Sequence, residues 1–229
     1  MSELYFVFKG ISSVDMPMMV NELPPITKAA ADINKIVIPG RDGFLTEDMG
    51  THSGTVKPVE CTLLDLSRVD EVSAWLEGSG DVIFSNQPDR RYKATIINQI
   101  PFSRIFKDKW YSFIIILECQ PLAAMLNNEA IALLVPGIIY NSGTHKSKPV
   151  ITIYGAGTID LTVNSAVIHL TNVVEYVTID SDLMDCYKDT ILKNNNMLGE
   201  FPKLDVGENV ISWTGTVTKV EILPNWCCL

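Results

Sequence analysis

Apolar residues in this chain occur in short runs that alternate with polar residues and stop at turn-forming residues, a pattern that favours β structure. After residue 128 seven such runs follow at close spacing: Val150–Tyr154, Thr158–Val163, Ala166–Leu170, Glu175–Ile179, Asp185–Lys188, Val210–Trp213 and Val217–Leu223. Asn164 and Ser165 separate two of them and predict a two-residue hairpin. Seven short strands with polar turns and no clear helix predict a β-sandwich.

The first part of the chain also predicts strands. Val59, Cys61 and Leu63 alternate with polar residues, which is the period of a half-buried strand. Further strands are expected at Leu4–Phe8, Val82–Phe84, Tyr92–Ile96 and Trp110–Glu118. The last is apolar on both faces at its centre, so we expect cover on both sides. Loops or turns are expected at Gly50–Thr55, Asn86–Asp89 and Asn194–Gly199.

A single segment has the spacing of a helix. Its apolar face would consist of Val69, Val72, Trp75 and Leu76. Asp65 or Ser67 can cap its start, and Gly78 with Gly80 can end it. Trp75 could serve as a ligand platform, but a Trp at helical spacing more often packs into a core.

The segment Ile38–Gly43 predicts a tight turn between two apolar runs, Ile36–Ile38 and Phe44–Leu45. Pro39 presets its own φ, and Gly40 and Gly43 permit the positive φ that such turns need. Arg41 and Asp42 would then be exposed at the tip. Two interpretations follow: a charged hairpin loop, or a contact point for another protein molecule made by Gly40, Arg41, Asp42 and Gly43.

The pattern changes after Pro121, where Leu122–Val135 is a mixed connector. We therefore expect a domain boundary near Asn128, with one domain over residues 1–128 and a second over 129–229. With 229 residues, 47% of them hydrophobic and 20% charged, the chain can build two cores of modest size.

Charge and targeting signals restrict the partners. A net charge of −9 disfavours gripping a phosphate backbone or an anionic membrane, although DNA can pass such a protein without binding. Glu3 lies where a signal peptide needs positive charge, and no apolar run is long enough to span a membrane. We expect synthesis and folding in the cytosol.

No catalytic or metal-binding motif emerges, and we expect neither a cofactor nor a metal. The five cysteines, which are dispersed apart from the vicinal pair Cys227–Cys228, are expected to be reduced structural thiols, and three distant histidines suggest no metal site. Asp180–Asp185 begins like a calcium loop but has Met184 at a ligand position, which favours a polar loop. Two of the carboxyl groups of Asp160, Glu175 and Asp180 could form the catalytic pair of a glycosidase. Arg90, Arg91 and Lys93 form a basic spot that is most simply a solvated strand face.

Several short motifs, taken in order, resemble the distal tail protein (Dit) family. Dit is the hub subunit of long-tailed, non-contractile phages of Gram-positive hosts and of related prophages. The matching segments in the first half are Gly10–Ser13, Leu23–Ile26, Ile38–Gly43, Trp75–Gly78, Ile83–Ser85, Pro88–Asp89 and Tyr92–Ala94. Those in the second half are Asn141–Thr144, Lys148–Pro149, Ser181–Lys188, Gly199–Pro202, Ser212–Trp213 and Pro224–Trp226. Cys227 departs from the family, whose members often have a basic residue there.

The resemblance implies a mainly β protein with an N-terminal ring-forming domain that contains one short α-helix, followed by a C-terminal galectin-like β-sandwich. It implies a homohexameric ring at the phage tail tip, in the virion, made in the host bacterial cytoplasm. The implied partners are other copies of the chain, the tail tube protein, the tail-associated tip protein or lysin, and a receptor-binding protein. Acidic side chains lining such a ring would repel DNA phosphates and let a genome slide through.

Two other functions stay open on the sequence. A carbohydrate-binding protein would present exposed aromatic residues, and the second half offers Tyr140, Tyr154, Tyr176, Tyr187, Trp213 and Trp226. A cell-wall hydrolase would need an acid/base pair or a metal site, neither of which stands out.

Overall fold

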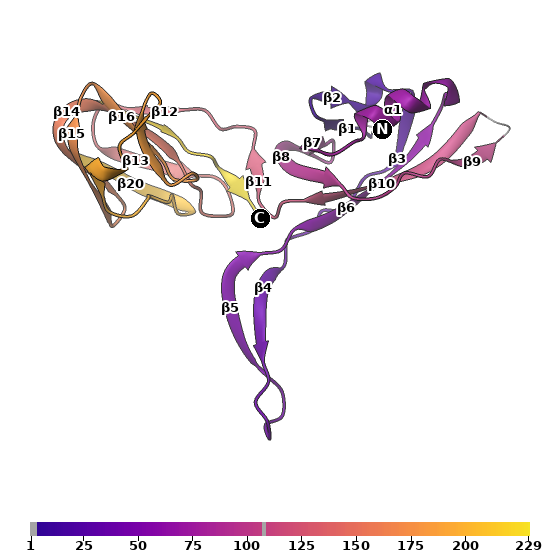
Figure 1. Ribbon diagram of the computed structural model, residues 1–229, viewed down its shortest axis with the longest axis horizontal. Helices are drawn as coiled ribbons and strands as arrows, with labels where there is room; N and C mark the ends of the chain where they lie inside the picture. The colour runs from indigo at the N-terminus through magenta and orange to yellow at the C-terminus, as the bar shows by residue number, and fades with distance from the viewer. Residues whose placement is uncertain (1–3, 107–108) are drawn as a thin grey trace. The chain divides into compact units, whose positions relative to one another are not determined.

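The computed structural model describes residues 4–106 and 109–229 and divides into two compact units, residues 1–123 with Leu229 and residues 124–228 (Figure 1). The division falls slightly before Asn128. Asn128 belongs to the second unit, because its side chain bonds there to the Asn225 side chain at 3.2 Å and to the Trp226 backbone N–H at 3.3 Å.

The first unit is built mostly from antiparallel strands. Its strands are β1 (Phe6–Phe8), β2 (Ile11–Ser12), β3 (Met18–Glu22), β4 (Ala31–Ile36), β5 (Leu45–His52), β6 (Thr55–Leu63), β7 (Ser79–Phe84), β8 (Gln87–Ile96), β9 (Ser103–Phe106) and β10 (Trp110–Cys119). Its helices are the 3₁₀ segments η1 (Ser13–Asp15) and η2 (Leu66–Arg68) and the α-helix α1 (Val69–Trp75). The main sheet has the order β2-β1-β7-β8-β10-β6-β3, with β9 paired to β10, whereas β4 and β5 form a separate two-stranded sheet.

The predicted helix is confirmed, and Trp75 is a core residue. Asp65 caps the start of the helical segment by accepting a hydrogen bond from the Ser67 backbone N–H at 2.9 Å. The Trp75 ring stacks on Phe6 with a centroid distance of 5.4 Å, and its Nε1–H donates to the Phe8 carbonyl at 3.0 Å. These contacts fix α1 (Val69–Trp75) over the buried face of the sheet. Within the described residues, no helix is long and apolar enough to cross a membrane.

Three predictions about the first unit need correction. β5 continues to His52, because Gly50 lies in a β-bulge with φ 69° rather than in a loop, so the connection to β6 is only residues 53–54. β8 begins at Gln87, so Pro88 and Asp89 lie in a strand and the turn is residues 85–86. β10 is buried on one face only: Ile115 is fully buried, whereas Ile114 on the other face is 45% exposed, because no layer formed by the described residues of the first unit covers that side.

The second unit is the predicted β-sandwich. Its strands are β12 (Ile131–Leu133), β13 (Gly137–Asn141), β14 (Val150–Val163), β15 (Ala166–Val173), β16 (Tyr176–Asp180), β17 (Asp185–Lys188), β18 (Ile191–Leu192), β19 (Met197–Leu198) and β20 (Gly207–Leu223), with the 3₁₀ segment η3 (Asn194–Asn196). Two short strands, β11 (Ala123–Met125) and β21 (Cys227–Cys228), pair with each other outside the sheet of the sandwich. Asn164, with φ 54°, turns β14 into β15, as predicted for the hairpin.

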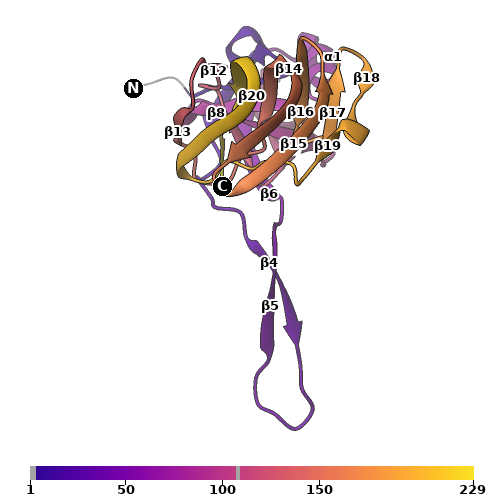
Figure 2. The ribbon, with the colours of Figure 1, turned by 90° about the vertical axis from the view of Figure 1, so that its left-hand side faces the viewer.

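Two long strands belong to both layers of this sandwich. β14 and β20 pair along most of their lengths, and the register shifts near Gly155 and Gly157. The first half of β14 pairs with β16 and its second half with β15, so the strand crosses from one layer to the other (Figure 2). The predicted breaks at residues 155–157 and 214–216 are therefore bends within continuous strands.

Glycine makes the bend possible. A Cβ at Gly155 would overlap the Thr216 carbonyl oxygen, and Gly215, with φ 96°, would place a Cβ against the Thr158 carbonyl oxygen. The close approach of the two backbones thus requires glycine at both positions. Both halves of the bent strands contribute to one core, which includes the fully buried Ile151, Ile153, Ile159, Leu161, Ile168, Ile211 and Ile222.

Candidate assembly interface

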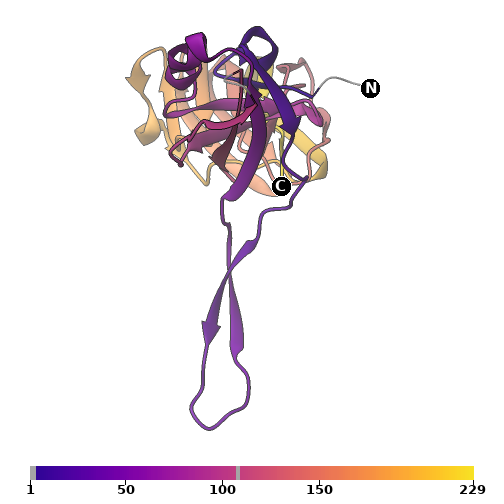
Figure 3. The same cartoon turned by 90° about the vertical axis from the view of Figure 1, so that its right-hand side faces the viewer.

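The hairpin of β4 and β5 with its connecting loop, residues 31–52, is called the arm below. It extends from the first unit as a two-stranded ribbon (Figure 3). The register pairs Ile36 with Leu45 and Asn34 with Glu47, and the Asn34 amide donates to the Glu47 carboxylate at 3.3 Å. At its base, Asp32 accepts hydrogen bonds from the hydroxyls of Thr51, at 2.7 Å, and Ser53, and these bonds lower the pKa of its carboxyl.

The arm exposes apolar side chains on both of its faces. Its large exposed hydrophobic residues are Ile33, Ile36, Val37, Ile38, Phe44, Leu45 and Met49. Val37 is 72% exposed and Met49 is 58% exposed. A two-stranded hairpin is marginally stable in water, and contiguous exposed apolar surface usually marks an interaction site. The arm therefore has the composition of a segment that is buried against another polypeptide.

The tip of the arm has the turn geometry that its sequence predicts. The Arg41 backbone N–H donates to the Ile38 carbonyl at 3.2 Å, which closes a four-residue turn. Pro39 occupies the second position and Gly40, with φ 82°, the third, which is the arrangement of a type II turn. Gly43 also has a positive φ, of 81°. In the described part of the chain, the side chains of Arg41 and Asp42 form no hydrogen bond or ion pair, so both charges face solvent.

The first unit also contains a groove on the uncovered face of its main sheet. The groove has a volume of about 510 Å³, and its lining includes Asn21, Glu60, Asn98, Ser112, Ile114 and Ile116. Among the described residues, β8 (Gln87–Ile96) pairs with β10 only at residues 117–119 and β9 pairs with β10 only at residues 110–112, which leaves the groove between them. The gap along β10 is left open to solvent.

Asn98 replaces the missing strand at this gap. Its side-chain amide donates to the Ile114 carbonyl at 2.8 Å and accepts from the Ile116 backbone N–H at 2.8 Å. These two bonds are the ones a neighbouring strand would make. Because Asn98 holds the β10 backbone without covering its side chains, Ile114 stays exposed beside the groove.

The carboxylates considered for chemistry have separate structural partners. Asp160 contacts His169, its direct cross-strand neighbour, and Glu175 contacts Lys188 at 2.6 Å. Asp180 accepts from the backbone N–H groups of Asp182 and Leu183, at 2.9 and 3.0 Å. The Asp180–Asp185 segment is thus a turn stabilised by its own aspartate, with Met184 at φ 57°. Over residues 4–106 and 109–229, no cluster of three or more potential metal ligands occurs.

The remaining sequence candidates have local partners. Arg90 contacts Asp89 at 2.9 Å and Arg91 contacts Asp81 at 3.3 Å, so both arginines of the basic spot are compensated within their own unit. All five cysteines are free thiols. Burial raises the pKa of Cys119, Cys186 and Cys227 to about 11 in each case, which keeps these thiols protonated at neutral pH.

The six tyrosines and tryptophans of the second unit do not form an exposed platform. Trp226 is buried, and Tyr140 is the one residue of the six with a largely exposed side chain. The ring of Tyr176 lies 5.8 Å from the ring of Tyr154 and 5.2 Å from the Lys188 ammonium, so its faces are occupied by protein groups. This arrangement differs from the stacked platform that a sugar site presents.

No protein-family model matches the sequence, and neither does any curated protein. Among solved structures the chain is similar to the Dit protein of phage SPP1, described as a paradigm of the hub adsorption apparatus in phages that infect Gram-positive bacteria. That match has a TM-score of 0.77 at 13% identity and covers 96% of this chain and 98% of that one. The chain therefore has a Dit-like fold.

Weaker matches involve the baseplate of phage P2 in its activated conformation. The structure with calcium matches with a TM-score of 0.45 at 7% identity, and the structure with strontium with 0.46 at 6%. Each match covers 97% of this chain and 98% of the other. Scores at this level do not support a detailed comparison of the folds.

Proposed function

We propose that this chain is a structural hub protein of a phage tail tip, which forms a hexameric ring and joins the tail tube to the tip and host-adhesion proteins. The proposal combines a Dit-like fold over nearly the whole chain with surfaces suited to contacts between copies. Its partners are other copies of itself, the tail tube protein, the tail-associated tip protein or lysin, and a receptor-binding protein. It acts in the virion and performs no catalysis.

The exposed apolar arm is the observation that carries this proposal. Exposing a cluster of large apolar side chains to water is unfavourable by about 25 cal/mol for each Å² that an interface would cover. Covering even one such side chain fully contributes about 1.5–3 kcal/mol. Seven of them, at residues 33–49, supply a substantial driving force for association.

The arm of one copy docks on the uncovered sheet face of the next copy. One surface projects and the other is concave, so the contact is between different faces, as in a ring closed by rotation. Ile114 and Ile116 in the groove provide apolar contacts for the arm, and the polar side chains that line it can meet the polar residues of the arm. Each subunit then both inserts an arm and receives one.

The tip residues Gly40, Arg41, Asp42 and Gly43 set the register of this contact, at a subunit or tube junction. Two opposite charges held by a turn of fixed geometry favour one alignment over its neighbours, adding specificity more than affinity. The net charge of −9 suits a ring through which DNA passes without binding.

The test is a mass measurement of the native assembly. In the parent chain we expect a hexamer, either alone or after coexpression with its tail tube protein. Replacing residues 31–52 with a short Gly-Ser linker should give a monomer that retains the β circular dichroism and the thermal transition of the remaining sheets. A hexamer that persists without the arm would refute the docking role.

Charge reversal at the tip is the finer test. Arg41→Glu should weaken the assembly, whereas the matched control Lys203→Glu, an exposed lysine of the second unit, should leave its mass unchanged. An assembly unaffected by Arg41→Glu would remove the tip from the interface while leaving the arm in it.

A further inference from the structure

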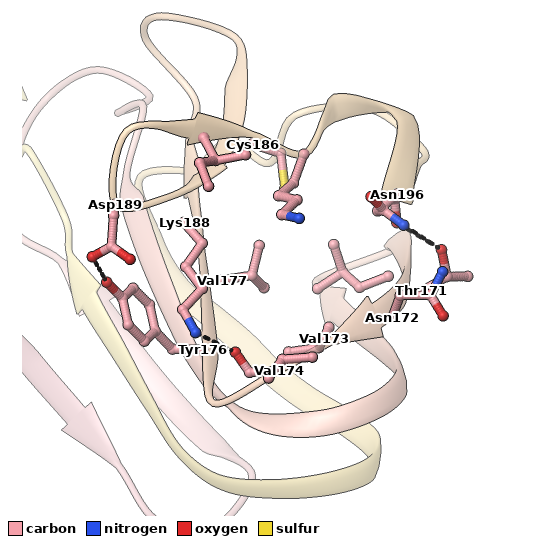
Figure 4. A pocket seen from close by; sticks show the side chains of 13 residues that line it. Thr171, Asn172, Val173, Val174, Tyr176, Val177, Cys186, Lys188, Asp189 and Asn196 are labelled. Carbon is pink, nitrogen blue, oxygen red and sulfur yellow. Dashed lines mark hydrogen bonds between the residues drawn. The ribbon is translucent and has the colours of Figure 1, made fainter.

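The second unit contains a cavity of about 300 Å³ at the open edge of its sandwich. The cavity lies between the end of β15 in one layer and the strands β16 and β17 in the other (Figure 4). Its floor is formed by Leu170, Val173, Val177 and Cys186, which all belong to the buried core. An apolar group that entered here would therefore continue the core of the sandwich.

The walls of the cavity are held open by hydrogen bonds between elements. The Tyr176 hydroxyl donates to the Asp189 carboxylate, and Lys188 Nζ donates to the Val174 carbonyl at 2.9 Å. On the other side, the Asn196 amide donates to the Thr171 hydroxyl at 3.4 Å (Figure 4). A cavity with walls tied in this way is formed before any ligand arrives, which lowers the entropy cost of binding.

The rim contains backbone conformations that side-chain-bearing residues rarely adopt. Asn172, Glu175 and Asp189 have φ values of 55°, 67° and 52°. Such left-handed residues cost free energy and occur often at binding sites. Here they turn the chain sharply at the ends of β15 (Ala166–Val173) and β17 (Asp185–Lys188), and Val174 and Asp189 of the two connections line the cavity.

Among the charged side chains that line the cavity, Lys188 and Asp189 are already engaged, with Glu175 and the Tyr176 hydroxyl respectively, which leaves Lys193 to meet an anionic group on the ligand. Lys188 is paired with Glu175 at 2.6 Å. Lys193 also lines the cavity and is only partly exposed, yet its ammonium has no carboxylate partner in the described part of the chain. A cation held beside an apolar floor without a counter-charge is stabilised by a carboxylate brought in by a ligand.

The rim extends the apolar surface beyond what a small molecule covers. Val174, Ile191 and Leu192 are each more than 60% exposed. Ile191 and Leu192 form β18, the last strand on its side of the sheet order, and among the described residues no strand pairs with its outer edge. An extended polypeptide can add to such an edge with backbone hydrogen bonds while one side chain fills a pocket.

From these observations we propose that this cavity binds an extended segment of a partner polypeptide, in which a large aliphatic side chain lies next to an aspartate or glutamate. The segment pairs with the free edge of β18, its aliphatic side chain enters the cavity above Val177, and its carboxylate meets the Lys193 ammonium. This site is separate from the ring contact and uses no residue of the arm.

The experiment selects linear peptides from a random displayed library against the full-length chain and locates them by methyl NMR. Enriched peptides should pair an aliphatic residue with an acidic one and should shift the methyl signals of Leu170, Val173 and Val177. Lys193→Glu should weaken their binding about tenfold, as expected for loss of a charged contact. The matched control Lys203→Glu should bind them like the parent chain.

Two further binding measurements distinguish the alternatives. Peptides in which lysine replaces the acidic residue should bind Lys193→Glu better than the parent chain, an inversion that misfolding does not produce. Octanoate carries the same carboxylate and aliphatic chemistry on a free small molecule, and it should bind more weakly than the peptides.

Four results would overturn the inference: no enrichment of any peptide, methyl shifts elsewhere in the molecule, equal binding to parent and Lys193→Glu, or octanoate binding as tightly as the peptides. The last would assign the cavity to a small carboxylate. None of these results bears on the hexamer mass, so the failure of this inference and that of the ring proposal are distinguishable.

Discussion

The arm and the sandwich use the same kinds of residues in opposite ways. In the sandwich, two long strands bend at glycine and fold their apolar side chains into one interior, where Ile151 and Ile222 are fully buried. In the arm, two strands extend from the rest of the first unit, and their apolar residues Ile33 and Leu45 are exposed.

This difference separates intramolecular stability from stability that requires a partner. A residue of the sandwich core contributes its burial free energy as soon as the chain folds. A residue of the arm contributes it only when another polypeptide covers the hairpin. The same substitution should therefore affect folding in one region and assembly in the other, and the following predictions test that distinction on the dissociated subunit.

The largest effect is expected at the bend of the sandwich. Gly215→Val should lower the free energy of unfolding by roughly 2–6 kcal/mol, because it combines a positive φ of 96° with an overlap against the Thr158 carbonyl oxygen. Urea unfolding followed by circular dichroism measures it. Gly43→Ala, at the arm tip, also has a positive φ but no nearby atom, so its cost should be only about 1 kcal/mol. Equal costs would show that the bend does not depend on close backbone contact.

A matched pair of isoleucines gives the next largest effect. Ile153→Ala in the sandwich core should cost about 2–5 kcal/mol in unfolding free energy, whereas Ile36→Ala in the arm should stay within about 0.5 kcal/mol. Native mass measurement should show the reverse for assembly, with a loss for Ile36→Ala. If Ile36→Ala destabilised the isolated subunit as much as Ile153→Ala, the arm would be part of the folding core.

Asn98 tests the open face of the first unit. Asn98→Ala removes both bonds to the β10 backbone and should cost about 1–3 kcal/mol, because the Ile114 carbonyl and the Ile116 N–H lose their partner. Chemical unfolding again provides the value, with the exposed Asn195→Ala as a control expected within about 0.5 kcal/mol. A neutral Asn98→Ala would mean that water replaces the amide without loss.

The smallest expected effect concerns Lys57, a buried lysine on the core side of β6 with its ammonium 4.8 Å from the Tyr92 ring centroid. Burial lowers the pKa of Lys57 below its ordinary value of 10.5, so the unfolded chain binds the proton more tightly. The contribution of Lys57 to stability therefore rises with pH in the alkaline range up to 10.5 and is unfavourable at neutral pH.

Lys57→Met should accordingly raise the free energy of unfolding at neutral pH by about 1 kcal/mol. The gain should shrink as the pH rises through that alkaline window. Unfolding curves of both proteins across this range give the difference directly. A loss of stability at neutral pH would indicate that the attraction between the ammonium and the Tyr92 ring outweighs the desolvation of the charge.

Local patterns were sufficient to predict many elements. The alternation at Val59, Cys61 and Leu63 and the helical spacing of Val72 and Trp75 each describe one element and its buried face. The turn at Gly40 was predictable for the same reason, since the proline and glycine determine its backbone conformation locally. Whether that turn makes a contact between subunits stays a prediction.

Features that depend on distant partners were not predictable. Gly155 and Gly215 have the same sequence signature whether they end a strand or bend it, and the outcome depends on the strand that lies alongside. The exposure of Ile114 follows from the absence of a covering layer in the first unit, which no property of β10 reveals. Lys193 reaches the cavity only because η3 packs beside β15, far away in sequence.

The continuity of β14 and β20 through both layers has a mechanical consequence. When a pulling force acts on one layer, covalent backbone transmits it to the other, and the layers cannot slide apart without straightening two bent strands. A force applied to either edge of the sandwich therefore strains both layers together.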